Sequence, residues 1–328
     1  MTVLAKRTKE NLRIIYMGTP EFAVAPLQML LDNQYNVVAV VTMPDKPAGR
    51  GHKLQSSPVK QSAENQNIPV LQPEKLKDPV FLAELEAYKA DLFIVVAFRM
   101  LPEVVWNMPE LGTFNLHASL LPQYRGAAPI NWAIIRGENE TGVTSFFLTH
   151  EIDTGDILLQ RKMPIETTDN AGTLHDKLML LGAETVKDTV DYILSESPKR
   201  IPQQKLAAEN TLQAAPKLFK DNCRIQWDNT SEECVNFIRG LSPYPAAHTE
   251  ITDAKMLLHP TKVLAASAEI EKHNLSTGTI DTDNKTYIKV ATTDGWVQLH
   301  TIQIAGKKAM QTEELLRGFK LNISEKQA

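Results

Sequence analysis

Three polar residues of this chain have the side-chain types and the spacing that acyl-transfer chemistry requires. Asn115 and His117 stand two positions apart in a short run that predicts a strand, so their side chains point to one face. Asp153 follows in a turn closed by Gly155. An amide donates hydrogen bonds, an imidazole is neutral or charged near neutral pH, and a carboxylate orients and charges such an imidazole. The pattern therefore indicates an acyl-transfer site.

The same residues also have a structural interpretation, which the pattern alone leaves open. Asparagine and aspartate favour turns, and a single histidine on a strand often serves as hydrogen-bonded packing. A zinc site is not favoured, because the histidines do not stand at ligand spacings such as H-x-x-x-H; this holds for His117, His150, His175 and His248.

Two further segments have the composition of binding elements. Ser119-Leu120-Leu121-Pro122 breaks the predicted strand and offers backbone donors and acceptors beside apolar side chains, which suits a flat heterocycle. Residues 42–60 form a long connection after a buried strand, and long loops in compact domains are functional or disordered. Its basic residues face only Asp45; they are Lys46, Arg50, Lys53 and Lys60. A solvated surface loop is the alternative for this segment.

A dinucleotide cofactor is not expected at the first strand-to-helix turn. The sequence Gly18-Thr19-Pro20-Glu21-Phe22 lacks the G-x-G-x-x-G spacing that lets a backbone approach a pyrophosphate. Gly18 is explained by a tight turn, and Pro20 suits the first turn of a helix.

The elements that must position these residues alternate between strands and helices. Strands are expected at 12–17, 35–43, 91–98, 112–116, 141–149 and 157–165, and helices at 21–31, 79–88, 101–108 and 128–136. This alternation favours a Rossmann-like, doubly wound, mostly parallel sheet. Residues 173–194 predict one long helix with Thr173 as its N-cap.

The composition and the hydrophobic periodicity of the sequence change after residue 195. Residues 196–216 are polar and contain prolines, which is typical of a linker. Short runs of period two follow at 224–227, 255–264, 286–291 and 296–304, with a helix at 231–241 and a hairpin turn at 293–295. We therefore expect a catalytic domain over 11–195, a linker over 196–216 and a small OB-like β-barrel domain over 217–322.

The bulk composition limits the other possibilities. The chain has 328 residues, a net charge of -4 and a pI near 6.1, so contact with a polyanion would need a local basic patch. Cys223 and Cys234 lack metal-ligand spacing and favour two reduced thiols, with a disulfide as the alternative. Residues 1–10 lack the apolar core of a signal peptide, and no apolar run approaches about 18 residues, so we expect a cytoplasmic protein without a membrane segment.

The order of the motifs resembles that of the formyltransferases that use 10-formyltetrahydrofolate. The resemblance rests on residues 114–130, 140–144 and 153–156. Within that superfamily, residues 18–23, 44–51 and 305–310 are similar to the methionyl-tRNA formyltransferase family. The resemblance extends from Leu12 to about Phe319. It implies a folate-dependent transfer of a formyl group to the α-amine of charged initiator methionyl-tRNA, for translation initiation.

The resemblance also implies roles for individual residues. The family's catalytic residues fall on Asn115, His117 and Asp153, and its folate contacts fall on Ser119, Leu120, Leu121 and Pro122, with Phe98 and Leu101 beside the pterin. Its tRNA-reading loop falls on residues 42–60, with Arg50 as the reader of the stem end and Lys46 and Lys53 beside it. This chemistry needs no metal, and we expect a monomer.

Two features depart from the family pattern. The segment Ala97–Pro102 lacks the usual glycine and is one residue shorter, which affects the roles of Arg99 and Met100. From Thr211 on, 14 basic residues face 14 acidic residues, so a C-terminal tRNA contact needs a one-sided patch, for which the candidates are Lys217, Lys220, Lys307 and Lys308. The competing interpretations are a glycinamide-ribonucleotide or sugar-nucleotide formyltransferase, a silent tRNA-binding module and a formyltetrahydrofolate hydrolase.

Overall fold

The computed structural model describes residues 7–48, 53–195, 198–207 and 211–322. Contacts divide the chain into two compact units. Unit 1 comprises Met1–Gly126, Gly142–Met163 and His175–Ala214, and unit 2 comprises Ala127–Thr141, Pro164–Leu174 and Ala215–Ala328. The two units are defined by contacts within the folded chain and do not test the domain limits expected at residues 195 and 217, which remain a prediction.

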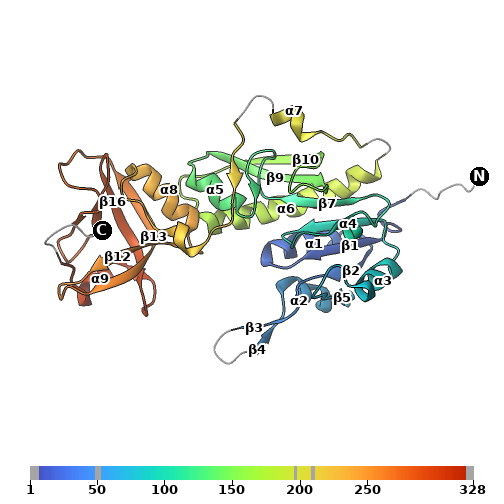
Figure 1. Ribbon diagram of the computed structural model, residues 1–328, viewed down its shortest axis with the longest axis horizontal. Coiled ribbons are helices and arrows are strands. Elements are labelled where there is room, and N and C mark those ends of the chain that lie inside the picture. Colours follow the sequence, from blue (N-terminus) through green and yellow to red (C-terminus); the bar gives the residue numbers. More distant parts are fainter. Residues whose placement is uncertain (1–6, 49–52, 196–197, 208–210, 323–328) are drawn as a thin grey trace, which may run out of the picture. The chain divides into compact units, whose positions relative to one another are not determined.

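A seven-stranded sheet forms the centre of unit 1, in the order β10-β9-β7-β6-β1-β2-β5 (Figure 1). Its strands are β1 (Ile14–Gly18), β2 (Val37–Val41), β5 (Val70–Leu71), β6 (Leu92–Val96), β7 (Thr113–His117), β9 (Glu140–Phe147) and β10 (Ile157–Pro164). The strands from β7 to β5 pair in parallel, whereas β9 runs antiparallel to β7. Residues of β1 and β6 are buried throughout, as their apolar sequences require. The predicted mostly parallel sheet is confirmed.

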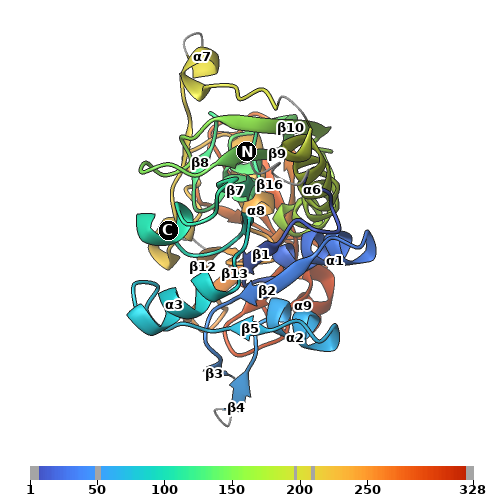
Figure 2. The same ribbon diagram turned by 90° about the vertical axis from the view of Figure 1, so that its right-hand side faces the viewer.

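Helices cover both faces of this sheet. They are η1 (Glu21–Ala23), α1 (Val24–Asp32), α2 (Pro58–Asn65), α3 (Pro79–Ala87), α4 (Glu103–Trp106) and α6 (Ala171–Leu194), and α7 (Gln203–Ala207) lies in the segment that follows α6. Ile15 and Met17 of β1 pack in one cluster with Phe81 of α3. Tyr16 points to the opposite face, where its hydroxyl donates to the carbonyl oxygen of Ala23 at 2.6 Å. Figure 2 shows α3 on one side of the sheet and α1 and α6 on the other.

The start of α6 differs from the prediction. The helix begins at Ala171, so Thr173 lies inside its first turn and the expected N-cap at Thr173 is wrong. Asn170 takes that role, because its Oδ1 atom accepts a hydrogen bond from the Thr173 backbone N–H at 3.0 Å.

Unit 2 contains the predicted small β domain, and its strands form an antiparallel sheet. The strand order is β12-β13-β16-β15-β14, with β17 paired to β16. The strands are β12 (Ala247–Thr252), β13 (Leu258–Glu269), β14 (Ile280–Asp281), β15 (Lys289–Ala291), β16 (Trp296–Ile304) and β17 (Met310–Gln311), and the helices are α5 (Pro129–Ile135), η2 (Lys220–Cys223), α8 (Ser231–Leu241) and α9 (Thr312–Gly318). The predicted turn at 293–295 joins β15 to β16. The predicted strand at 224–227 is wrong, since only Arg224 makes an isolated bridge there, to His248.

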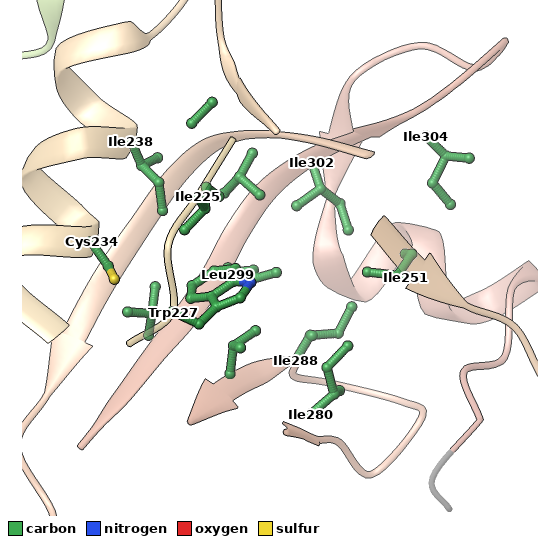
Figure 3. Packing of buried hydrophobic residues seen from close by; sticks show 14 of the residues in the cluster. Ile225, Trp227, Cys234, Ile238, Ile251, Ile280, Ile288, Leu299, Ile302 and Ile304 are labelled. Carbon is green, nitrogen blue, oxygen red and sulfur yellow. The ribbon is translucent and has the colours of Figure 1, made fainter. Parts of the chain in front are cut away.

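The core of unit 2 lies between its sheet and α8. Cys234 and Ile238 of α8 pack with Trp227 and with Leu299 and Ile302 of β16 (Figure 3). A capping box at Thr230 and Glu233 begins α8. Truncating a buried branched side chain of this kind costs about 2–5 kcal/mol, so the cluster is a main source of the unit's stability.

Candidate active site

His117 is the last residue of β7, and its imidazole is held between two oxygen atoms. Nε2 lies 2.8 Å from the carbonyl oxygen of Tyr124, and Nδ1 lies 3.8 Å from Oδ2 of Asp153. Because a carbonyl oxygen only accepts hydrogen bonds, Nε2 carries a hydrogen and Nδ1 is the nitrogen that faces the carboxylate. The structure brings the predicted His117 and Asp153 together, and it adds Tyr124 as a partner that the sequence did not indicate.

Asn115 stands in the middle of β7, on the same face of the sheet as His117. Its neighbours in the sheet are Val95 of β6 and Phe146 of β9. The residue is half-buried, and its carboxamide makes no hydrogen bond to any residue in the described part of the chain. The amide N–H groups of Asn115 are thus available to a ligand placed beside the imidazole.

Asp153 reaches His117 because the segment between β9 and β10 turns back along the sheet. β9 runs antiparallel to β7, so its last residue, Phe147, pairs with Phe114 near the start of β7 and not with His117. The return places Asp153 at φ +55°, a left-handed conformation. A Cβ atom at Gly155 would lie 1.7 Å from the carbonyl oxygen of Phe147, so only glycine fits the close approach.

The segment Ser119–Pro122 uses much of its backbone within the protein. Thr144 Oγ1 donates to the carbonyl oxygen of Ser119 at 2.6 Å and accepts from the Leu121 N–H at 3.1 Å. Gln160 Nε2 donates to the carbonyl oxygen of Leu121 at 2.6 Å. Leu121 and Pro122 are buried, whereas Leu120 is half-buried. Among the apolar side chains predicted to contact a heterocycle in this segment, that of Leu120 is the most accessible.

The shortened segment Ala97–Pro102 is fixed through Arg99. Its guanidinium donates to the carbonyl oxygens of Pro73 and Glu74, the latter at 2.8 Å, and burial lowers the pKa of the group. Ala97 has φ +46°, a conformation that glycine adopts more easily.

The two residues predicted to lie beside a pterin stand on either side of an exposed methionine. Phe98 is half-buried and Leu101 is buried, whereas Met100 is 71% exposed. The structure thus presents Met100 to solvent from this segment.

The basic segment after β2 forms a hairpin rather than an irregular loop. β3 (Lys46–Ala48) and β4 (Lys53–Gln55) pair antiparallel, with Lys46 opposite Gln55. Lys46 is exposed, and Lys53 begins β4. Arg50, the predicted reader of the stem end, lies outside the described residues.

Lys60 does not add free positive charge to this hairpin. Its ammonium group lies 2.7 Å from Oδ2 of Asp45 and 2.9 Å from Oε1 of Gln72. Gln72 Nε2 donates to Oδ1 of the same aspartate at 2.8 Å. The hydrogen bond from Lys60, followed by that from Gln72, lowers the pKa of Asp45. These three side chains form a clamp at the base of the hairpin.

Among the described residues, His, Cys, Asp and Glu side chains form no group of three that could hold a metal ion. No helix in the same part of the chain is both long and apolar enough to cross a bilayer.

Family models and curated relatives match the chain over nearly its whole length. The model described as "Formyl transferase" matches residues 11–190, and "Formyl transferase, C-terminal domain" matches residues 217–320. A methionyl-tRNA formyltransferase from Bacteroides thetaiotaomicron is 59% identical over 314 residues, which are 96% of this chain and 98% of the relative. One from Flavobacterium johnsoniae is 52% identical over 310 residues, which are 94% and 97% of the two chains.

Solved structures share the fold at lower identity. The sugar 3N-formyl transferase WlaRD, determined with dTDP and 5-N-formyl-THF, has a TM-score of 0.63 and 21% identity over 90% of this chain and 99% of its own. HypX from Aquifex aeolicus, in complex with tetrahydrofolic acid, has a TM-score of 0.61 and 18% identity over 93% of this chain and 47% of its own. These likenesses show that the chain shares the fold of the two structures.

Proposed function

Because the chain belongs to the formyl transferase family, and within it to the methionyl-tRNA formyltransferases, we propose that it transfers the formyl group of 10-formyltetrahydrofolate to the α-amine of methionyl initiator tRNA. The observation that carries the proposal is the His117 imidazole held between the Tyr124 carbonyl and the Asp153 carboxylate, beside the amide of Asn115. The folates bound by WlaRD and HypX support a folate-derived donor.

The reaction breaks one carbon–nitrogen bond and forms another. The neutral α-amine attacks the formyl carbon, and the carbonyl oxygen becomes the oxyanion of a tetrahedral intermediate. The intermediate collapses when the bond to N10 of the folate breaks. The proton lost by the amine balances the proton gained by N10, so the products are the N-formyl amide and tetrahydrofolate. The site must therefore stabilise an oxyanion and move one proton.

Asn115 is the direct donor to the oxyanion in this proposal. Its carboxamide has no competing partner in the described part of the chain, so donation to substrate costs no internal hydrogen bond. His117 acts differently, because its Nε2–H already donates to the Tyr124 carbonyl. Protonation at Nδ1 would place a positive charge between that carbonyl and Asp153, close to the developing negative charge.

In this proposal Asp153 orients the imidazole from the Nδ1 side. At 3.8 Å its carboxylate is beyond direct hydrogen-bond distance from Nδ1, so the coupling between them is electrostatic. Together with a water, the carboxylate would relay the proton from the amine to N10 of the folate.

Binding of the two substrates is assigned to separate segments. Folate would contact the segment Ser119–Pro122 together with Phe98 and Leu101. The acceptor stem would contact Lys46 and Lys53 of the hairpin, and also Arg50, as the resemblance to the family implies. Arg50→Ala should then raise the KM for tRNA and leave the KM for folate unchanged, with a weaker dependence on salt.

The direct test is formylation of charged initiator tRNA with 10-formyltetrahydrofolate, run beside charged elongator methionine tRNA. Fast formylation of the first and slow formylation of the second supports the proposed function. If neither tRNA is formylated and a small amine or a sugar nucleotide is formylated instead, the assignment of tRNA as the acceptor is wrong. Formate release without any acceptor would indicate a hydrolase.

A further inference from the structure

Gln203 is a fully buried polar side chain in the segment that the sequence assigned to a linker. The residue is 0% exposed, and it begins α7. Its Nε2 atom donates to the carbonyl oxygens of Asp153 and Gly155, at 2.9 Å and 2.8 Å. Its Oε1 atom accepts from Nε and Nη2 of Arg125, at 3.0 Å and 2.6 Å. All of these residues belong to unit 1.

This carboxamide holds both ends of the turn that carries Asp153. Two carbonyl oxygens flank Thr154, and a single NH2 group joins them, which fixes the backbone on both sides of that residue. The turn needs such support, because Asp153 has φ +55° and a non-glycine residue in that conformation stores strain. A buried carboxamide with both hydrogens donated and its oxygen occupied has no unsatisfied group, so it is a stable anchor.

The same segment also reaches the other partner of His117. The backbone N–H of Tyr124 donates to the carbonyl oxygen of Gln213 at 2.6 Å. Further back, Ile157 and Ile201 exchange two backbone hydrogen bonds of 2.9 Å. The segment therefore holds the turn that supplies the Asp153 carboxylate and the loop that supplies the Tyr124 carbonyl.

We propose that Gln203 is a positioning residue of the active site, which sets the distance between the Asp153 carboxylate and the His117 imidazole through the backbone of residues 153–155. The inference rests on the proposed function, because it gives Gln203 a role in catalysis through Asp153. It implies that the segment after α6 is part of the catalytic apparatus and more than a tether to unit 2.

Three substitutions separate this role from simple packing. Gln203→Met keeps the volume of the side chain and removes every hydrogen bond. Gln203→Glu keeps oxygen acceptors for Arg125 but removes both donors to the turn. Gln204→Ala, at the exposed neighbouring residue, is the matched control. We expect the first two variants to lose about 10- to 100-fold in kcat, no more than removal of the Asp153 charge and up to the effect of misplacing a catalytic group by about 1 Å. The KM for folate and for tRNA should stay within about twofold, because Gln203 contacts no substrate.

A double mutant separates a positioning role from a structural one. In an Asp153→Asn background, adding Gln203→Met should lower kcat by less than about threefold, because the carboxylate that the turn positions is already gone. Full additivity of the two substitutions would overturn the proposal. Wild-type activity of Gln203→Glu would also overturn it, since the anchor would then be the contact with Arg125 alone.

Hydrogen exchange gives a readout that does not depend on activity. The backbone N–H of Gly126 donates to Oδ2 of Asp153 at 3.0 Å, so its protection reports the position of the carboxylate. Exchange at Gly126 should be about tenfold faster or more in Gln203→Met than in Gln204→Ala, with unchanged protection in β1 and β6. Unchanged exchange at Gly126 would overturn the proposal, whereas faster exchange without formylation activity in the wild type would overturn only the proposed function.

Discussion

Nδ1 of His117 lies 3.8 Å from Oδ2 of Asp153, although the strands that precede the two residues run in opposite directions. The pair exists only because the turn after β9 folds back toward the end of β7. A site made in this way depends on the turn as much as on the two side chains.

Asn115→Ala should lower the single-turnover rate of formyl transfer by about 100- to 1,000-fold, the usual effect of removing one oxyanion donor. Stability should change little, because the carboxamide makes no hydrogen bond to another described residue. The rate is measured by quenched flow with saturating folate and charged tRNA. A loss below about tenfold would show that the amide is not the main donor.

Asp153→Asn should also lower the single-turnover rate, by about 10- to 100-fold, because the charge beside the imidazole is lost while the shape of the side chain is kept. Glu151→Gln removes an exposed carboxylate from the same turn and serves as the control. An equal loss of rate in the two variants would mean that the net charge of the turn matters and the position of Asp153 does not.

Gly155→Ala tests the turn itself. The new methyl group would lie 1.7 Å from the carbonyl oxygen of Phe147, so the turn must move and carry Asp153 away from His117. We expect a loss in kcat of about 100-fold. Gly318→Ala at the end of α9 is the control, because its Cβ would meet no atom within 4 Å. Wild-type kcat in Gly155→Ala would show that the backbone tolerates the shift.

The parts of this site differ in how far the sequence could predict them. Asn115 and His117 could be placed together from the sequence, because the period of two in a strand puts them on one face. The pairing of His117 with Asp153 could be suggested but not built, since it depends on β9 running antiparallel to β7 and on a left-handed residue in the turn. The fold class of both units could also be predicted, because the residue patterns of short strands and turns are local in the sequence.

Two partners of the site, Tyr124 and Gln203, could not be predicted at all. Tyr124 contributes a backbone carbonyl, a group that every residue has, so its side chain gave no signal. Gln203 stood in a polar stretch with prolines, and such a composition is typical of a linker. Only the folded chain shows that this glutamine is buried and that it is bonded to a turn about 50 residues away in sequence. Its isolated position among exposed polar residues gave the sequence no periodicity to detect.

Lys60→Met should loosen the base of the basic hairpin and destabilise the protein in a pH-dependent way. In the folded state the bonds from Lys60 and Gln72 lower the pKa of Asp45, so the carboxylate contributes stability above its ordinary pKa of about 4 and loses it as the pH falls through the lowered value. The difference in free energy of unfolding between the wild type and Lys60→Met should therefore shrink below about pH 4.

The measurement is urea unfolding of both proteins at several pH values between 3 and 7. Lys77→Met serves as the control, because Lys77 is exposed and lies just before α3. It should change the free energy of unfolding little at every pH. A destabilisation by Lys60→Met that stays constant over the whole range would contradict the assignment, because it would then come from packing and not from the ionised Asp45.

Both cysteines should be free thiols that do not react in the folded protein. Cys223 and Cys234 are 1% and 0% exposed and form no disulfide. Burial, together with the nearby carboxylates of Glu233, Asp228 and Asp294, raises the pKa of Cys234 to about 12, and burial raises that of Cys223.

The reactive species toward a disulfide reagent is the thiolate, and at pH 8 a thiol with a pKa near 12 is ionised in only about one molecule in ten thousand. Ellman's reagent at pH 8 should therefore label neither cysteine in the native protein and both in guanidinium chloride, which matches the two cysteines of the sequence. Substrates should not change this result, because both side chains lie in the core of unit 2 and not at the candidate site. Rapid labelling of either thiol in the native state would show that the core opens around α8. Fewer than two thiols after unfolding without a reductant would show that the cysteines form a disulfide.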